Sequence, residues 1–427
     1  MFQDFIKTLH DSLPAATFSY ALALLGVLWF VWLFIFNKSG NNGLPPGPRP
    51  LPLVGNLLSL DPELHTYFTA LSKVHGPIYT LWLGKKPGII ISSPAMAREV
   101  LKDQDATFAN RDVPVVGREA TYGGKDIVWT PYGPEWRMLR KMFLTILNVI
   151  TGMMWGGTVK GKERESLASE FREIVAEMTE LLGLPNVSDF YPGLAKFDLQ
   201  GMQGKMKGVA SKLDKIFQGV IDQRLKMDEK ESKDFLQVLL QLKDEGDEKT
   251  PFTITHVKSL LMDMVVGGTD TTSNAIEFAM AELMNKPEVI HKLQEEVDAV
   301  VGKDNIVEES HIHQLPYLYA VMKETLRLHP TLPLLVPHCP TQTCLVGGYT
   351  VPQGSRVFVN VWAIHRDPSI WENPLEFRPE RFLDSKWDFT GKDFNYFPFG
   401  SGKRICAGMA SAERMFMYAL ASMIHSF

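Results

Sequence analysis

The alternation of hydrophobic and polar residues predicts a mostly helical chain with a small strand-rich part. Apolar residues recur every three to four positions, the period of an amphipathic helix. Short apolar runs around a turn at Lys85–Gly88, and again within 345–360, predict strands. Residues 108–131 mix Gly, Pro and Asp with aromatics and are expected to form a loop. The predicted helices cover residues 94–103, 133–155, 164–183, 205–245, 286–301, 313–328 and 408–425.

The N-terminal pattern differs, because residues 15–36 contain no charge. This 22-residue run is long enough to cross a membrane as a helix, and too long for the apolar core of a signal peptide. Pro and Gly then follow at a density that cannot continue a helix, which predicts a stiff hinge. Lys38 and Arg49 favour a cytosolic body, although Lys7 precedes the run. The expected parts are a membrane anchor (1–37), a proline-rich hinge (38–56) and one soluble domain (57–427).

Composition narrows the function only a little. The chain has 427 residues, of which 45% are hydrophobic and 22% charged, so it can bury a substantial core. A formal net charge of −5 gives no reason to expect nucleic acid as a partner, which normally requires a basic surface. Cys339, Cys344 and Cys406 are too few for a disulfide framework and lack the CxxC spacing of a structural zinc site. A reduced compartment fits best.

One of these cysteines has an unusual context, the stretch FPFGSGKRICAG. A free cysteine is by default a small hydrophobic residue, but Cys406 precedes a predicted helix, whose positive end favours a thiolate. Gly402 and Gly408 would allow the close approach of a flat ligand. Arg404 offers a fork of donors for a carboxylate, and Phe399 can shield the sulfur. A thiolate, a flat ligand and an anionic rim together indicate haem with an axial cysteine.

The pattern F-x-x-G-x-R-x-C-x-G around Cys406 resembles the haem-binding signature of cytochromes P450. A second match, KETLR, places Glu324 and Arg327 three residues apart on a helix, as in the family's E-x-x-R motif. In the family an arginine from a downstream P-E-R-F, here Arg381, completes the motif. The resemblance implies a buried structural triad rather than a common surface ion pair, so loss of one member should be severe.

The segment GGTDTTSN supports two interpretations. From the residues alone, a helix would end at Gly267–Gly268, and Thr269 or Asp270 would cap a new one. The resemblance implies instead the long central helix of the family, locally opened over the haem. Asp270 and Thr271 then match the acid–alcohol pair that relays protons during oxygen activation.

Weaker matches concern the rim of the haem and the substrate. Trp136 and Arg140 form a W-x-x-x-R pair similar to the family's propionate-binding helix, and His338 matches a position often placed against a propionate. A lone Trp or His is usually a packing residue, so each signal is weak alone. Basic residues near Arg140 fit an acidic electron donor as well as an ordinary solvated face. The resemblance places at the substrate pocket Val266, Gly267, Leu332 and Val336.

The resemblance covers essentially the whole chain and implies a haem b monooxygenase that uses O2. Electrons would come from NADPH through a cytochrome P450 reductase on the endoplasmic reticulum membrane, with the catalytic domain in the cytosol. Stretches such as PLLVPHCP resemble plant microsomal enzymes, among them the group containing cadinene hydroxylase. The expected substrate is therefore small and apolar, a terpenoid, with phenylpropanoids or flavonoids as the alternative. P450-fold isomerases and dehydratases use peroxides, and the intact G-x-D-T segment argues against them.

Two departures from the family pattern bear on competence. The family normally adds a further helix and loop after Lys141, whereas Met142 follows directly here, so several tens of residues are expected to be missing. The family also continues beyond Phe427 with a strand hairpin that reaches the substrate pocket. Deleting packed helices removes core contacts, at a cost comparable to the ~5–15 kcal/mol stability of a domain. A haem-poor, catalytically impaired isoform is therefore a third hypothesis.

Overall fold

The computed structural model describes residues 15–38, 43–147, 161–226, 235–245, 251–268, 270–383 and 387–426. It is mostly helical with a small strand-rich part, as predicted. The helices are α2 (Ala15–Lys38), α3 (Leu64–His75), α4 (Pro94–Arg98), α5 (Val115–Ala120), α6 (Pro134–Leu147), α7 (Gly161–Gly183), α8 (Val187–Phe190), α9 (Met202–Arg224), α10 (Phe235–Asp244), α11 (Ile254–Gly268), α12 (Asp270–Asn285), α13 (Pro287–Val301), α14 (Pro316–Leu328), α15 (Val361–Ile364) and α16 (Met409–Ser426). The strands are β1 (Ile78–Leu83), β2 (Lys86–Ile91), β3 (Cys344–Val346), β4 (Tyr349–Val351) and β5 (Arg356–Val359).

Most predicted helices are present within a few residues, but two local predictions are wrong. The turn expected at Lys85–Gly88 begins earlier, because Gly84 takes the positive φ of 62° and β2 already starts at Lys86. The expected loop 108–131 contains the short helix α5, which buries Val116 and Ala120. The predicted helix 133–155 is α6 up to Leu147, and its remainder lies outside the described residues.

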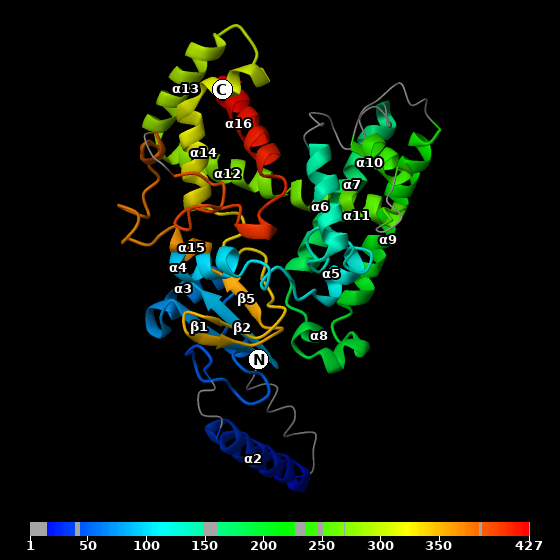
Figure 1. Cartoon of the computed structure of the whole chain (residues 1–427), viewed down its shortest axis with the longest axis vertical. Coiled ribbons are helices and arrows are strands. Elements are labelled where there is room, and N and C mark those ends of the chain that lie inside the picture. The colour runs from blue at the N-terminus through cyan, green and yellow to red at the C-terminus, as the bar shows by residue number, and fades with distance from the viewer. Residues whose placement is uncertain are drawn as a thin grey trace.

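The described helices form two lobes that lie side by side, and a small sheet-containing region lies below one of them (Figure 1). One lobe, built from α5, α6, α7, α9, α10 and α11, encloses a core that includes Phe217 and Leu260. The other lobe contains α12, α13, α14 and α16 around a core that includes Leu318 and Leu420. In the sheet-containing region, α3, α4 and α15 lie beside β1, β2 and β5.

The central helices α11 and α12 connect the two lobes. Val257 and Leu261 of α11 are buried in the first core, whereas Ala275 and Ala279 of α12 are buried in the second. The two helices are separated only by Thr269, which lies outside the described residues. The residues near the junction, such as Asp270 and Thr271, therefore lie between two helices that are each buried in a different core.

The strand order of the main sheet is β1-β2-β5, with β1 antiparallel and β5 parallel to β2. The described part of the hinge is fixed to this sheet rather than extended away from it. The Thr80 N–H donates to the Pro46 carbonyl (2.7 Å), and the Thr80 hydroxyl donates to the Pro45 carbonyl (3.0 Å). A Cβ at Gly47 would lie 2.0 Å from the Thr80 carbonyl oxygen, so only glycine allows this approach.

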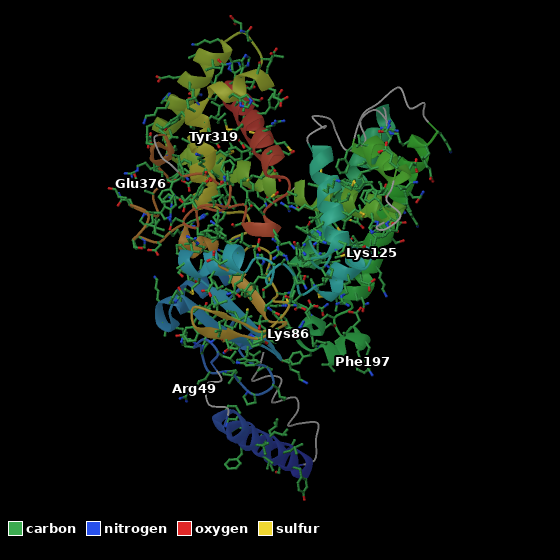
Figure 2. All side chains as sticks on the ribbon, viewed as in Figure 1. Arg49, Lys86, Lys125, Phe197, Tyr319 and Glu376 are labelled. Atoms are coloured by element: carbon green, nitrogen blue, oxygen red, sulfur yellow. The ribbon has the colours of Figure 1, made fainter. Side chains whose placement is uncertain are left out.

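Helix α2 occupies the predicted anchor and lies apart from both lobes, beneath the sheet-containing region (Figure 1). Its described side chains are exposed, among them Tyr20, Leu24 and Phe30. Within the part of the chain that the structure describes, no helix has the length and apolarity needed to cross a membrane, so the predicted span is not confirmed. Arg49 and Phe197 lie at the end of the body that faces α2 (Figure 2).

Candidate active site

Cys406 lies in the loop that leads into α16. Its N–H donates to the Phe399 carbonyl at 3.0 Å, which closes the loop. Gly402 has a φ of 68°, and a Cβ there would lie 1.9 Å from the Leu101 carbonyl oxygen. Gly402 thus serves packing against backbone, not the approach of a flat ligand. At Gly408 the nearest atom to an added Cβ is the Cys406 Sγ at 4.0 Å, so a side chain there would enter the space beside the sulfur.

The Cys406 thiol is free, and the residue is exposed. We expected the end of the following helix to lower its pKa, and this expectation is wrong. Although part of the residue is accessible, desolvation raises the pKa of Cys406, and the Gly408 N–H and the charge of Arg140 offset this only in part. Helix α16 begins only at Met409. A thiolate therefore requires a bound metal ion, which deprotonates a coordinating thiol.

Four basic side chains gather beside this loop, and we call them the basic cluster: Arg111, Arg140, His338 and Arg404. Arg404 uses all three of its side-chain nitrogens on backbone carbonyls of the loop 108–130. Nε donates to Ala109 (2.6 Å), Nη1 to Ile127 (2.6 Å) and Nη2 to Thr130 (2.5 Å). The expected free fork of donors is thus a brace between the cysteine loop and the loop 108–130.

Trp136 and Arg140, from α6, complete this brace. The Trp136 Nε1–H donates to the same Ile127 carbonyl at 3.0 Å, and the Arg404 guanidinium lies 4.7 Å from the centre of a Trp136 ring. Arg140 donates from Nη1 to the Ile405 carbonyl at 2.9 Å, one residue before the cysteine. The W-x-x-x-R pair is therefore held against the cysteine loop, as its proposed role at the haem rim requires.

Arg111 belongs to the cluster but was not predicted, since a single arginine in a loop has no recognisable pattern. Its Nη1 donates to the Val336 carbonyl at 2.5 Å, whereas its Nε is buried and without a hydrogen-bond partner in the described structure. Burial and the charge of Arg404 lower the pKa of Arg111 to about 9. A buried cation with an unused donor is costly unless something pairs with it.

His338 is buried, and its Nδ1 lies 2.8 Å from the Phe108 carbonyl oxygen. Because a carbonyl only accepts, Nδ1 carries the proton. Burial and the charges of Arg111 and Arg404 hold the pKa of His338 well below its usual range, so the imidazole is neutral. A carboxylate bound nearby would act in the opposite direction.

The basic cluster fits a ligand with carboxylates. In the described structure, the hydrogen bonds of Arg111, Arg140 and Arg404 all go to backbone carbonyls, and no carboxylate lies within ion-pair distance of them. Three features agree with haem and its two propionates. They are the unpartnered buried Nε of Arg111, the free sulfur of Cys406, and Gly408, which keeps the space beside that sulfur open.

The triad of Glu324, Arg327 and Arg381 comes together in the structure. The Arg327 Nε and Nη2 donate to the two Glu324 carboxylate oxygens at 2.7 and 2.8 Å, and the Arg381 Nε donates to Glu324 at 3.0 Å. Arg327 also donates to the carbonyls of His365, Pro374 and Glu376. The Glu324 and Arg327 side chains are fully buried, and every side-chain nitrogen of Arg327 has a partner.

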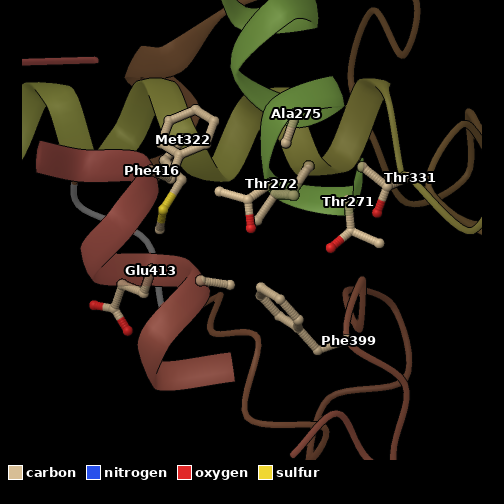
Figure 3. Close-up of a pocket in the computed structure, with 10 residues that line it drawn as sticks. Thr271, Thr272, Ala275, Met322, Thr331, Phe399, Glu413 and Phe416 are labelled. Atoms are coloured by element: carbon tan, nitrogen blue, oxygen red, sulfur yellow. The ribbon is translucent and has the colours of Figure 1, made fainter. Parts of the chain in front are cut away.

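Thr271 lies close to the junction of the central helices. Its hydroxyl donates to the Gly267 carbonyl at 2.7 Å, four residues earlier. Helix α11 ends at Gly268 and α12 begins at Asp270, and the single, locally opened helix implied by the resemblance stays a prediction. A pocket of about 40 Å³ lies between α12, α14 and α16, with Thr271, Thr331 and Phe399 among its lining residues (Figure 3). The four residues predicted for the substrate pocket do not line it: Val266, Gly267, Leu332 and Val336.

Comparison with known proteins gives a consistent family. The family model described as Cytochrome P450 matches residues 45–149 and 142–427. Flavonoid 3'-monooxygenase from Petunia hybrida is 36% identical and is aligned over 96% of this chain and 90% of its own length. Geraniol 8-hydroxylase from Swertia mussotii is 37% identical over 96% and 92% of the two chains. Ferruginol synthase from Isodon rubescens is 35% identical over 95% and 92%.

A solved structure of a zebrafish cytochrome P450 with progesterone superposes with a TM-score of 0.72 at 25% identity, over 85% of this chain and 92% of that one. The curated relatives are of the plant type, whereas membership in the group containing cadinene hydroxylase stays a prediction. Fold, site and relatives agree, and the chain belongs to the cytochrome P450 family.

Proposed function

We propose that this protein is a haem-thiolate monooxygenase that inserts one oxygen atom from O2 into a small apolar substrate, a terpenoid. The observation that carries the proposal is the basic cluster beside Cys406, which has cations but no carboxylate within ion-pair distance in the described structure. Haem would supply an iron ion for the Cys406 sulfur and propionates for the basic cluster.

In this proposal Cys406 would hold the haem iron through its sulfur, and Arg111, Arg140 and His338 would hold the propionates. Arg404 and Trp136 act indirectly. Their N–H groups both donate to the Ile127 carbonyl and so hold the loop 108–130 in place. Phe399 packs on Phe389 at 5.3 Å between ring centres and limits access of water to the sulfur side. When bound, haem b with a thiolate ligand supplies the activation of O2, with electrons from NADPH through a cytochrome P450 reductase.

Proton delivery is assigned to Asp270 and Thr271. Asp270 is the first residue of α12, and the Thr271 hydroxyl donates to the Gly267 carbonyl, which leaves its oxygen able to accept a proton from a neighbouring donor. In the proposal the Asp270 carboxyl gives its proton to the Thr271 oxygen, and the Thr271 hydroxyl proton leaves the Gly267 carbonyl and passes into the site. One oxygen atom then enters the substrate and the other leaves as water.

The relatives support two substrate classes. Geraniol 8-hydroxylase and ferruginol synthase bear terpenoid names, whereas the Petunia hybrida relative is a flavonoid 3'-monooxygenase. We place the terpenoid first, with flavonoids and other phenylpropanoids as the alternative. Attachment to the endoplasmic reticulum membrane through the N-terminal segment is part of the proposal, supported by the uncharged run 15–36 and the exposed apolar side chains of α2.

A catalytically impaired isoform is a second candidate, favoured by a specific observation. The family match is divided into two stretches that meet at residues 142–149. The alignment with the Petunia hybrida enzyme extends over 460 positions, more than the 427 residues of this chain, so the relative has residues that this chain lacks. We propose that the segment expected after Lys141 is among them.

The reduced carbon monoxide difference spectrum of the full chain in membranes separates these candidates. The red-shifted band of thiolate-ligated haem is expected if the site is competent. Turnover with reductase and NADPH, on geraniol and on a flavonoid in parallel, then assigns the substrate class. A blue-shifted band or no band would contradict the monooxygenase proposal for this chain and favour the impaired isoform.

A further inference from the structure

Arg111 lies in a short segment that is held on both sides of it. On one side, the Cys339 N–H donates to the Asn110 carbonyl at 2.9 Å. On the other side, the Val115 N–H donates to the Asp189 Oδ1 at 2.8 Å. The side chain of Arg111 itself makes a single hydrogen bond in the described structure, from Nη1. The position of its guanidinium therefore depends largely on how the neighbouring residues are held.

Asp112, the next residue, is held by two cations from two strands. Lys86 of β2 donates from Nζ to both Asp112 oxygens, at 2.8 and 2.7 Å, and Arg356 of β5 donates from Nε to Oδ2 at 2.5 Å. Lys86 lies on the side of the sheet-containing region that faces α8 (Figure 2). Desolvation would raise the pKa of Asp112, but Arg356 and Lys86 outweigh it and hold the pKa below its usual range. Asp112 is thus a carboxylate at neutral pH, and its contacts are charge-assisted hydrogen bonds, which are the stronger kind.

Strand β5 also places a second member of the basic cluster. Val357 follows Arg356, and its N–H and carbonyl are both hydrogen-bonded to His338 at 2.8 Å. Arg111 and His338 therefore depend on the same strand, one through the Asp112–Arg356 ion pair and the other through the backbone.

The negative charge of Asp112 serves the sheet and not Arg111. In the described structure, its ion pairs are with Lys86 and Arg356. Arg111 extends instead to the Val336 carbonyl. Two adjacent side chains thus reach different elements. The carboxylate nearest in sequence anchors the backbone and leaves the guanidinium open to an added anion.

We propose that Asp112 is a positioning residue, which holds the Arg111 guanidinium within the basic cluster by anchoring the backbone to β2 and β5. The role of Arg111 toward the haem propionates rests on the proposed function, whereas the anchor consists of contacts within this chain. No signature motif of the chain includes Asp112, Lys86 or Arg356.

Titration of the haem-free full chain with haem and with haem dimethyl ester, whose propionates carry no charge, tests this role. The ratio of the two affinities reports on the cations that meet the propionates, since a general loss of stability weakens both ligands alike. Wild type should favour haem by at least about tenfold. Asp112→Ala should lower the ratio to within about twofold of that in Arg111→Met. Asp103→Ala removes only an exposed ion pair with Arg98 and should keep the wild-type ratio.

A double variant separates positioning from an independent effect. If Asp112 acts through Arg111, the ratio in Arg111→Met/Asp112→Ala should equal that in Arg111→Met within about twofold. Asp112→Asn keeps an acceptor oxygen for one of the two cations, so it should fold even where Asp112→Ala does not. Its ratio should lie between those of wild type and Arg111→Met.

A second readout requires no haem. The Cys339 N–H reports whether the segment stays in place, because it donates to the Asn110 carbonyl. Hydrogen exchange at Cys339 should be about tenfold faster in Asp112→Ala, the effect of one lost hydrogen bond. It should be unchanged in Arg111→Met and in Asp103→Ala.

A wild-type ratio in folded Asp112→Ala or Asp112→Asn would overturn the inference, as would a further fall of the ratio when Asp112→Ala is added to Arg111→Met. Unchanged exchange at Cys339 in Asp112→Ala would also overturn it. Equal affinity of wild type for the two ligands would refute it together with the role of Arg111. The monooxygenase proposal is decided separately by the reduced carbon monoxide spectrum. If the thiolate band is absent, that proposal fails, and the exchange measurement still decides the anchor.

Discussion

Two buried arginine clusters in this protein differ in their partners: one contains a carboxylate, and the other has only backbone carbonyls within the described structure. In the triad, Glu324 receives hydrogen bonds from Arg327 and Arg381, and the remaining donors of Arg327 reach carbonyls. In the basic cluster, Arg111, Arg140 and Arg404 reach only carbonyls within the described structure, and Arg111 keeps an unused buried Nε. The first cluster contains its own carboxylate, whereas in the described structure the second has none within ion-pair distance, so its positive charge is open to an added anion.

The difference separates a structural from a ligand-binding arrangement of the same residue type. A buried charge is tolerated when its partner is present, and is costly otherwise. In the proposed function the bound haem removes this cost, so the cluster without a carboxylate, and not the triad, is assigned to the haem rim.

The largest expected effect comes from breaking the complete cluster. Glu324→Gln leaves Arg327 and Arg381 without a counter-charge in a fully buried position, and should lower the free energy of unfolding by about 3–5 kcal/mol. Urea unfolding checks this. Glu372→Gln removes an exposed ion pair with Arg378 and should leave the urea midpoint nearly unchanged. Equal midpoints for the two variants would refute the structural role of the triad.

Removal of the sulfur should abolish the haem signature without unfolding the protein. Cys406→Ser eliminates the thiolate ligand, so the reduced carbon monoxide band of the thiolate type should disappear completely. Because Cys406 is exposed, the unfolding free energy of the haem-free protein should change little. Cys344→Ser is the control and should retain the band. Persistence of the band in Cys406→Ser would show that the ligand is assigned wrongly.

Substitution within the basic cluster should have opposite effects on folding and on haem binding. Arg111→Met removes a buried unpaired cation, so the haem-free protein should be as stable as wild type or more stable. Haem affinity should fall by about tenfold or more, since a charge-assisted contact is lost. Urea unfolding and haem titration measure the two effects. Arg98→Met, at an exposed position, should change neither; a loss of stability in Arg111→Met would erase the contrast between the clusters.

The smallest expected effect concerns Thr271. Thr271→Ala removes a hydroxyl whose hydrogen bond to Gly267 is exposed, so haem affinity and stability should stay close to wild type. Product formed per O2 consumed should fall, because the proton path is interrupted. Thr331→Ala, in the same pocket, should preserve the ratio. Unchanged coupling in Thr271→Ala would remove this residue from the relay.

Helix positions and the Glu324–Arg327 pair could be predicted, since both rest on spacing within a few residues. Arg381 was reached only through the family resemblance, because its contact with Glu324 spans 57 positions. Arg111 and Asp112 carried no recognisable pattern. Their partners are backbone groups or residues far along the chain, such as Arg356, which is separated from Asp112 by 244 positions.

The wrong predictions share a cause, which is the use of a local rule where tertiary packing decides. The helix end after Cys406 argued for a lowered pKa, but desolvation by surrounding residues is the larger effect. Arg404 has the geometry to bind a carboxylate, yet the fold presents three carbonyls to it. Donor chemistry can be read from a residue type, whereas its partner depends on the whole fold.

The central claim is that the basic cluster is completed by the propionates of haem. The most direct measurement is titration of the haem-free protein with haem and, in parallel, with haem dimethyl ester, whose propionates carry no charge. Wild type should bind the ester at least about tenfold more weakly than haem, and Arg111→Met should show a smaller difference. Equal affinity of wild type for the two ligands would contradict the account.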